Sequence, residues 1–127
     1  MYLLDTNALI YMLCSPKTLS KQAEEILLSE RGIYVSIVSL WEIAIKQFIG
    51  KLKISSSIEE IERLCYEREI SILPIKAAEI EGTKNLPAIH KDPFDRLIIS
   101  QAQNNKLTII TNDTIIPKYE VKTISAQ

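Results

Sequence analysis

The chain has 127 residues, of which 46% are hydrophobic and 24% are charged, and its formal net charge at pH 7 is -1. This length and apolar content predict a single globular domain over residues 1–127 with a core of its own. The balanced charge excludes a protein whose whole surface is basic, so any contact with nucleic acid has to be local.

The N-terminus begins with Met1-Tyr2-Leu3 and carries no basic segment ahead of a long apolar stretch. A secretory signal is therefore not expected. The longest apolar runs in the chain are far shorter than the ~20 residues that a membrane span requires. We therefore expect a cytoplasmic protein that makes no contact with a membrane.

Short apolar or β-branched runs alternate along the chain with longer stretches of helical spacing. The runs are typical of buried parallel strands and cover residues 2–4, 33–35, 71–73, 107–110 and 121–124. The helical stretches cover residues 6–13, 20–29, 38–49, 58–69, 76–83 and 93–105. This alternation predicts a three-layer α/β/α sandwich with a five-stranded, mainly parallel sheet. Its ligand site is expected just beyond the carboxyl ends of the strands.

Two acids stand just after predicted strands. Asp5 follows the strand 2–4, and Asp113 follows the strand 107–110. Because the carboxyl ends of parallel strands lie at one edge of a sheet, both carboxylates are expected on the same rim. Two plainer interpretations stay open, since Asp5 would also cap the following helix and Asp113 would also form an Asx turn.

A third acid, Asp95, lies on the apolar side of a predicted helix, on the same arc as Phe94 and Ile98. A carboxylate in apolar surroundings shifts its pKa, pairs with a cation or binds a metal. Asp92 has a simpler explanation, because an Asp before Pro93 is a good helix N-cap. We assign Asp92 a structural role and leave a supporting role at the site open.

The fourth acid is Glu42, in the predicted helix 38–49, which is apolar on nearly every side. Such a helix is expected to be buried and to carry its acid inward. Two structural interpretations stay open. Glu42 would form a capping box with Ser39 if the helix began there, and it would also pair with Lys46 four residues later.

These acids are oxygen donors, the ligands that hard divalent cations prefer, and they predict a site for Mg²⁺ or Mn²⁺. The candidate ligands are Asp5, Glu42, Asp95 and Asp113. No cluster of His or Cys favours zinc. His90 is the single histidine and is assigned a structural or supporting role in a loop.

The acids occur in four segments, namely Leu3-Leu4-Asp5-Thr6-Asn7-Ala8-Leu9, Ser39-Leu40-Trp41-Glu42-Ile43, His90-Lys91-Asp92-Pro93-Phe94-Asp95-Arg96 and Thr111-Asn112-Asp113. Read together, they resemble the PIN-domain family, close to the VapC-like toxins of type II toxin-antitoxin systems. The resemblance spans essentially the whole chain, in order. Its most specific part is Asp92-Pro93-Phe94-Asp95-Arg96.

The resemblance implies a sheet order of 3-2-1-4-5 and a metal-dependent endoribonuclease that hydrolyses single-stranded RNA. The four acids would be both the catalytic residues and the metal ligands. Asn7, and either Thr111 or Asn112, would support them. Asn112 stands where many relatives have a basic residue, which removes a possible phosphate contact but no metal ligand. The resemblance also implies a homodimer and a cognate antitoxin that inserts into the cleft.

Two basic residues stand close to the acids in the sequence. Lys46 lies one helical turn after Glu42, and Arg96 directly follows Asp95. Each would either contact substrate phosphates at the rim or hold a carboxylate in a salt bridge. The salt bridge is the interpretation we favour for both.

Two other functions stay open. A catalytically idle PIN-like module would bind RNA or protein and keep its acids as helix caps and ion pairs. A receiver domain of two-component signalling shares the length, the five strands and an acidic magnesium pocket. However, it needs an Asp at the end of the third strand, where this chain has Leu73 followed by Pro74.

Overall fold

The computed structural model describes residues 1–127. The strands are β1 (Tyr2–Leu4), β2 (Ile33–Ser36), β3 (Ile70–Leu73), β4 (Thr108–Thr111) and β5 (Thr123–Ser125). The helices are α1 (Thr6–Cys14), α2 (Lys21–Ser29), α3 (Ile37–Phe48), α4 (Ile58–Glu67), α5 (Ala77–Thr83) and α6 (Pro93–Asn105). Two short 3-10 helices, η1 (Pro16–Thr18) and η2 (Ile116–Lys118), were not predicted.

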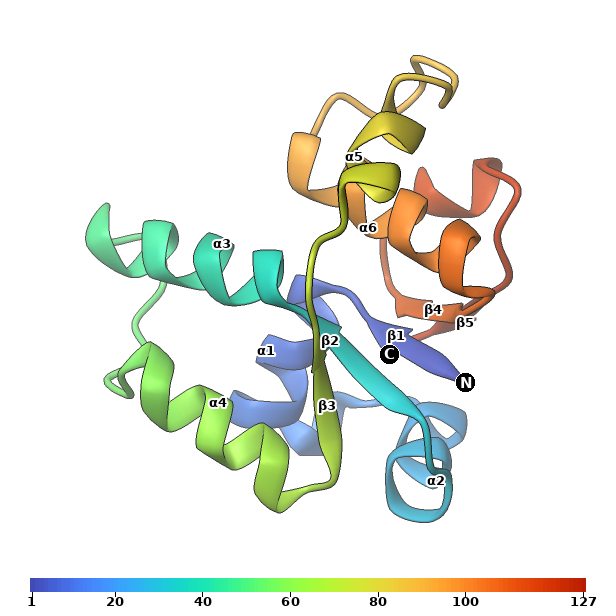
Figure 1. Ribbon diagram of the computed structural model, residues 1–127. Helices are drawn as coiled ribbons and strands as arrows, with labels where there is room; N and C mark the ends of the chain where they lie inside the picture. The colour runs from blue at the N-terminus through green and yellow to red at the C-terminus, as the bar shows by residue number, and fades with distance from the viewer.

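The five strands form one sheet in the order β3-β2-β1-β4-β5, and every neighbouring pair is parallel (Figure 1). The order implied by the resemblance is confirmed. In the central strand, Leu4 is in register with Val35 of β2 and Ile110 of β4. Asp5, the first residue after β1, therefore lies beside Thr111, the last residue of β4, at one edge of the sheet.

Alternating side chains divide the sheet between two cores. Leu4, Val35 and Ile110 point into a core with α1, α2 and α4. Leu3 and Ile109 point the other way, into a core with α6. Figure 1 shows α1, α2 and α4 on one side of the sheet and α5 and α6 on the other. The predicted three-layer sandwich is confirmed.

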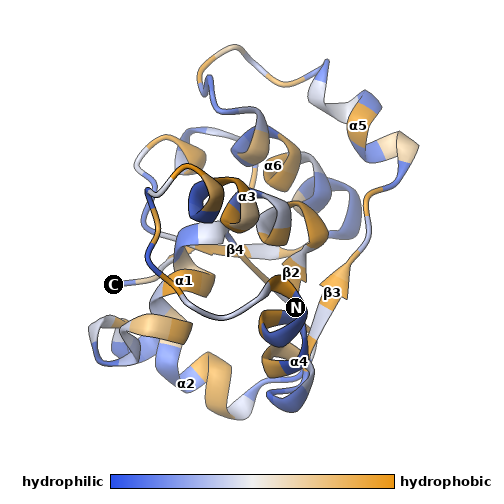
Figure 2. Ribbon diagram, turned by 90° about the vertical axis from the view of Figure 1, so that its left-hand side faces the viewer, coloured by the Kyte–Doolittle hydropathy of each residue, from blue (hydrophilic) through white to orange (hydrophobic).

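Helix α3 belongs partly to both cores. Its Leu40 and Ile43 pack into the first core, whereas Val38 packs into the second. The helix runs outward from the carboxyl end of β2, away from the sheet (Figure 1). Figure 2 shows hydrophobic colour on β2 and β3 and mixed colour on the surrounding helices, as expected for helices with one buried face. No helix combines the length and apolar character needed to cross a membrane.

Most predicted boundaries are right within one or two residues, and the differences follow from local capping. Ser20 and Ser57 accept backbone hydrogen bonds as N-caps of α2 and α4. The N-cap of α3 is Ser36, whose side chain accepts from the backbone of Val38 at 3.2 Å. The alternative in which Ser39 starts this helix and forms a capping box with Glu42 is therefore wrong.

The receiver-domain alternative is also wrong. Receiver domains are doubly wound sheets with the strand order 2-1-3-4-5. This sheet has the order 3-2-1-4-5, and β3 ends at Leu73 without an acid.

Candidate metal centre

Asp5 lies at the rim where β1 passes into α1. One carboxylate oxygen caps the helix and accepts a hydrogen bond from the backbone N–H of Ala8 at 2.8 Å. The other oxygen accepts a hydrogen bond from the hydroxyl of Thr111, the last residue of β4. Asp5 is buried. It is therefore a helix cap with a second oxygen turned across the sheet edge, and the cap interpretation covers only half of its contacts.

Thr111 joins two of the predicted acids. Its Oγ1 donates to Asp5 and accepts from the backbone N–H of Asp113 at 2.9 Å. Asp113 in turn accepts from the backbone N–H groups of Ile115 and Ile116 at 2.6 and 3.0 Å. The Asx turn considered for Asp113 is therefore present, but its other carboxylate oxygen is directed elsewhere.

Glu42 projects from the first half of α3 and is buried. Its Oε2 forms an ion pair with Lys46 at 3.2 Å, as predicted from the spacing. Its Oε1 is buried and has no hydrogen-bond partner. One turn earlier in the helix, Ser39 accepts a hydrogen bond from the Thr6 hydroxyl at 2.9 Å, which ties α3 to the start of α1. This contact holds Glu42 on the side of α3 that faces the sheet rim.

Asp95 lies in the first turn of α6. The helix is capped by Asp92, which accepts from the backbone N–H groups of Phe94 and Asp95 at 2.8 and 3.3 Å. The capping role predicted for Asp92 is confirmed. The side chain of Asp95 is partly buried, and its Oδ2 lies 3.1 Å from Nε2 of His90.

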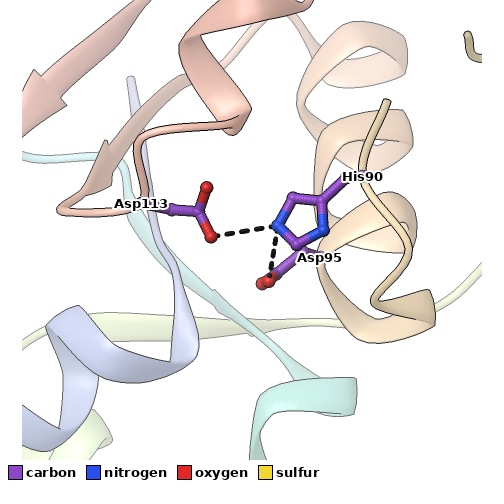
Figure 3. A group of neighbouring side chains, drawn as sticks. All are labelled: His90, Asp95 and Asp113. Atoms are coloured by element: carbon purple, nitrogen blue, oxygen red, sulfur yellow. Dashed lines mark hydrogen bonds and ion pairs between the residues drawn. The ribbon is translucent and has the colours of Figure 1, made fainter. Parts of the chain in front are cut away.

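His90 lies between two acids (Figure 3). Its Nε2 is 2.9 Å from Oδ2 of Asp113 and 3.1 Å from Oδ2 of Asp95. The other ring nitrogen, Nδ1, accepts from the backbone N–H of Asp92 at 3.2 Å. A neutral imidazole that accepts at Nδ1 carries its hydrogen at Nε2. His90 therefore donates to the pair of carboxylates, which stabilises two like charges that would otherwise repel.

Burial has a large effect on Asp5. Loss of water around the carboxylate raises the pKa of Asp5 to about 6. Hydrogen bonds from Thr111 and Ala8 oppose this rise, whereas the negative charges of Asp113 and Glu42 add to it. The pKa of Asp5 therefore shows that acids from two other stretches of the chain, Glu42 and Asp113, lie close enough to act on it.

Asp95 and Asp113 are affected in opposite directions. Burial and then the charge of Asp92 raise the pKa of Asp95 to about 7, with smaller contributions from Asp5 and Glu42. Partial burial of Asp113 also acts to raise its pKa. However, hydrogen bonds from His90 and two backbone N–H groups outweigh burial and hold the pKa of Asp113 below its usual value.

The four predicted acids do not form one tight cluster. The candidate ligand atoms that all lie within 4.8 Å of one another belong to His90, Asp95 and Asp113. Asp5 and Glu42 lie outside this group, although their charges act on Asp95. The carboxylates and the unpaired Oε1 of Glu42 nevertheless fit a hard divalent cation, because such an ion takes oxygen ligands and lowers the repulsion between them.

Arg96 does not have the partner that we predicted. Its guanidinium donates to the carbonyl oxygens of Thr83, Leu86, Pro87 and His90 at 2.7 to 3.3 Å, and it forms no ion pair. The predicted salt bridge is therefore wrong. These carbonyls come from the last residue of α5 and from the connection to α6, so Arg96 holds the loop that carries His90.

The side chains of two predicted supporting residues make no hydrogen bond to the acids. Asn112 bonds with the side chain and backbone of Gln127 at 2.7 and 2.9 Å, and accepts from Ser125 at 3.2 Å. Of the two alternatives near the last acid, Thr111 is the one that contacts the site. Asn7 is exposed and makes no side-chain hydrogen bond, so its supporting role stays a prediction.

The sequence did not indicate that His90 contacts two acids. Its loop is positioned by Tyr119, whose hydroxyl accepts from the backbone N–H of His90 at 2.7 Å and donates to the carbonyl of Pro87 at 2.8 Å. Together with Arg96, this contact sets where the imidazole lies. The only local signal was the spacing of His90 two residues before the helix cap Asp92.

Comparisons with known proteins place this geometry in context. Residues 2–122 match the PIN domain family. No curated protein is similar enough in sequence to count as a relative. Among solved structures, the chain is similar to VapBC2 from Rickettsia felis, bound to a DNA fragment from the promoter. The TM-score is 0.76 at 19% identity, covering 99% of this chain and 98% of that one.

Two further solved structures have the same fold. A toxin-antitoxin complex from Klebsiella pneumoniae gives a TM-score of 0.64 at 19% identity, over 98% of this chain and 97% of the other. FitAcB from Neisseria gonorrhoeae gives 0.65 at 17% identity, over the same shares. Identities this low establish the fold alone.

Proposed function

The chain belongs to the PIN-domain family, and we propose that it is a metal-dependent endoribonuclease that hydrolyses phosphodiester bonds of single-stranded RNA. The observation that carries the proposal is the group of buried and partly buried carboxylates that the fold brings together at the sheet rim. Asp5 and Asp95 have strongly raised pKa values, and Glu42 has a buried oxygen without a partner. Such a set is unfavourable unless a cation joins it.

We infer that Asp5, Glu42, Asp95 and Asp113 would hold Mg²⁺ or Mn²⁺. The chemistry that a divalent cation supplies in such a pocket is activation of water and polarisation of the scissile phosphate. Thr111 would orient Oδ2 of Asp5, since its hydroxyl donates to that oxygen. His90 would keep Asp95 and Asp113 together through its Nε2–H. Lys46 would hold Oε2 of Glu42 and leave Oε1 available.

The idle-module alternative requires each acid to be satisfied by a cap or an ion pair. Lys46 pairs with only one oxygen of Glu42, and Arg96 donates to backbone carbonyls rather than to an acid. Asp95 has no cation partner other than His90. The available protein groups thus leave the acids short of partners, which favours a bound cation over an idle site.

We also propose that the protein is the toxin of a toxin-antitoxin pair, neutralised by a cognate antitoxin. The similar folds include a toxin-antitoxin complex from Klebsiella pneumoniae, and the match covers nearly the whole of both chains. A homodimer is supported by large apolar side chains that this chain leaves exposed near the end of α3. Phe48 is 91% exposed, and Ile49 beside it is also exposed. Light scattering on the purified protein measures its assembly.

A nuclease assay tests the catalytic proposal. We expect the wild-type protein to cleave single-stranded RNA with Mg²⁺ or Mn²⁺ and to stop when EDTA is added. Asp5→Asn keeps a good helix cap but removes a charge, and should lower the rate by at least about 100-fold. Glu60→Gln is the matched control, because Gln also serves in the capping box of α4 and lies away from the site. Equal cleavage by wild type and Asp5→Asn would overturn the proposal and point to a contaminating nuclease.

A further inference from the structure

Two aromatic residues each precede one of the acids in the sequence of its helix. Trp41, the single tryptophan of the chain, precedes Glu42, and Phe94 precedes Asp95. Their ring centroids are 5.5 Å apart with an interplanar angle of 72°, an edge-to-face contact. The pair therefore joins α3 to α6 at the two points where these helices contribute an acid to the site.

The two rings differ in how they are held. Phe94 is partly buried and packs against the core under α6. Trp41 is 63% exposed, although an indole ring gains more than most side chains from burial. Because Phe94 braces one side of it, the indole is held in place with a large apolar surface open to a ligand.

Two of the basic residues near the acids are not free to bind a phosphate backbone, whereas Lys91, next to His90 in the sequence, is exposed. Lys46 is paired with Glu42, and Arg96 is saturated by backbone carbonyls. The net charge of -1 gives little general attraction for RNA. Because few phosphate contacts are available near the acids, we expect affinity for a single strand to draw on contacts with the bases as well, and stacking on aromatic rings is a contact that proteins use for this.

We propose that Trp41, braced by Phe94, is a stacking platform for one nucleobase of a single-stranded RNA whose phosphate lies at the acidic site. The inference rests on the proposed nuclease function and adds a substrate-positioning residue to it. Successive residues of a helix lie about 1.5 Å apart along its axis, so the aromatic pair is at the same level of α3 and α6 as Glu42 and Asp95. A stacked base would then belong to a nucleotide near the scissile phosphate. Because every base has an aromatic face, this contact positions the strand without selecting a sequence.

A second copy of the chain is the competing occupant of the exposed surface of α3. Phe48 and Ile49, the apolar residues near the end of the helix, have no acid beside them and are not braced by Phe94. We therefore assign only Trp41 to the base, and Tyr66, an aromatic residue of α4 that is 56% exposed, serves as the control for a general loss of exposed aromatic surface.

The test compares intact RNA with RNA in which single nucleotides near the cleavage position are abasic. For the wild-type protein, one such substitution should lower kcat/KM on the order of 10-fold or more, mainly by raising KM. In Trp41→Leu, intact RNA should already be cleaved with the raised KM, and the abasic substitution should add little. Trp41→Phe should recover part of the difference, and Tyr66→Leu should behave as wild type. Circular dichroism checks that each variant is folded.

Three outcomes would overturn the platform. The first is the same abasic effect in wild type and Trp41→Leu. The second is that Trp41→Leu lowers kcat/KM equally on intact and abasic RNA and also has a lower mass than wild type by light scattering. This outcome would assign Trp41 to the contact with a second copy. The third applies if the wild-type protein cleaves no RNA, so that the nuclease proposal fails, and it is unchanged fluorescence of the single tryptophan when RNA is added. Quenching by the intact oligonucleotide but not by an abasic one supports the platform, and unchanged fluorescence overturns it.

Discussion

Two regions of this protein bury carboxylates in different ways. Glu79 lies in the first turn of α5 and is almost completely buried. It accepts hydrogen bonds from the backbone of Lys76 at 2.9 Å and from the side chain of Asn105 in α6 at 2.7 Å. Gln101 adds a longer contact at 3.4 Å. At the sheet rim, by contrast, Glu42 is buried with one oxygen unpaired.

The comparison teaches that burial of an acid does not by itself mark a functional site. Glu79 is supplied with donors by its own helix start and by α6, so it serves to attach α5 to the body of the protein. At the rim, Asp5 is buried and Asp95 is partly buried. Loss of water and the charges of neighbouring acids raise the pKa of both groups, and the hydrogen bonds they accept do not offset this rise. The difference in hydrogen-bond supply separates a structural acid from a candidate ligand.

The largest expected effect contrasts Glu42→Gln with Glu79→Gln in the RNA cleavage assay. Both replace a buried carboxylate by an amide of the same shape. Glu42→Gln should lower kcat/KM on the order of 1,000-fold, about 4 kcal/mol, because a charged ligand is lost at the site. Glu79→Gln should stay within about threefold of wild type. Similar losses in the two variants would mean that hydrogen-bond supply does not distinguish the regions.

The next effect concerns stability and tests the structural role of Glu79. Glu79→Ala leaves the donors of Lys76 and Asn105 without a partner, and should lower the free energy of unfolding by about 3 kcal/mol. Glu81→Ala, which removes an exposed acid paired with Lys84, should cost less than about 0.5 kcal/mol. Urea denaturation measures both. A cost for Glu79→Ala no larger than that for Glu81→Ala would contradict the structural role.

The smallest effect is the pH dependence of Asp5→Asn, measured by urea denaturation with EDTA present. The pKa of Asp5 is about 6 in the folded protein and 3.8 for the ordinary group, so the folded state binds the proton more tightly. Stability from this group is therefore present below pH ~4 and is lost as the pH rises through ~6. Asp5→Asn does not titrate, so it should be more stable than wild type by about 1–2 kcal/mol at pH 7.5 and equal to it near pH 4.

Asp113→Asn provides the opposite sign for this measurement. The pKa of Asp113 is held low in the folded protein, so its charged form stabilises the fold above the ordinary pKa. The variant should be less stable than wild type at pH 7.5. For Asp5→Asn, the contradicting result is a gain in the free energy of unfolding that stays constant or shrinks as the pH rises. Burial of the charged Asp5 would then cost no stability.

Much of the fold could be predicted because its signals are local. Helix α6 begins and ends where the sequence predicts, since Asp92 and Pro93 start it and its apolar face repeats at helical spacing. β5 was predicted too early, at 121–124, because Val121 is apolar but packs near Tyr119 in the second core and is not part of the strand. The strand order came from the resemblance, since periodicity does not say which strands are neighbours.

The site was predictable in its acids but not in their partners. Lys46 follows Glu42 by one turn, so their ion pair could be read from spacing. Arg96 stands beside Asp95 in the sequence, but successive residues on a helix point about 100° apart, and Arg96 reaches the carbonyls of another segment. His90 meets Asp113 from 23 residues away, which no local pattern indicates.

The sequence by itself determined the alternation of strands and helices, the helix caps and the acids that follow strands, because these depend on neighbours within a few residues. Only the tertiary structure decided that His90 bridges Asp95 and Asp113, that Arg96 braces a loop, and that Glu42 keeps an unpaired oxygen. Hydrogen-bond partners are chosen among all groups that folding brings within about 3 Å, and those groups come from distant parts of the chain.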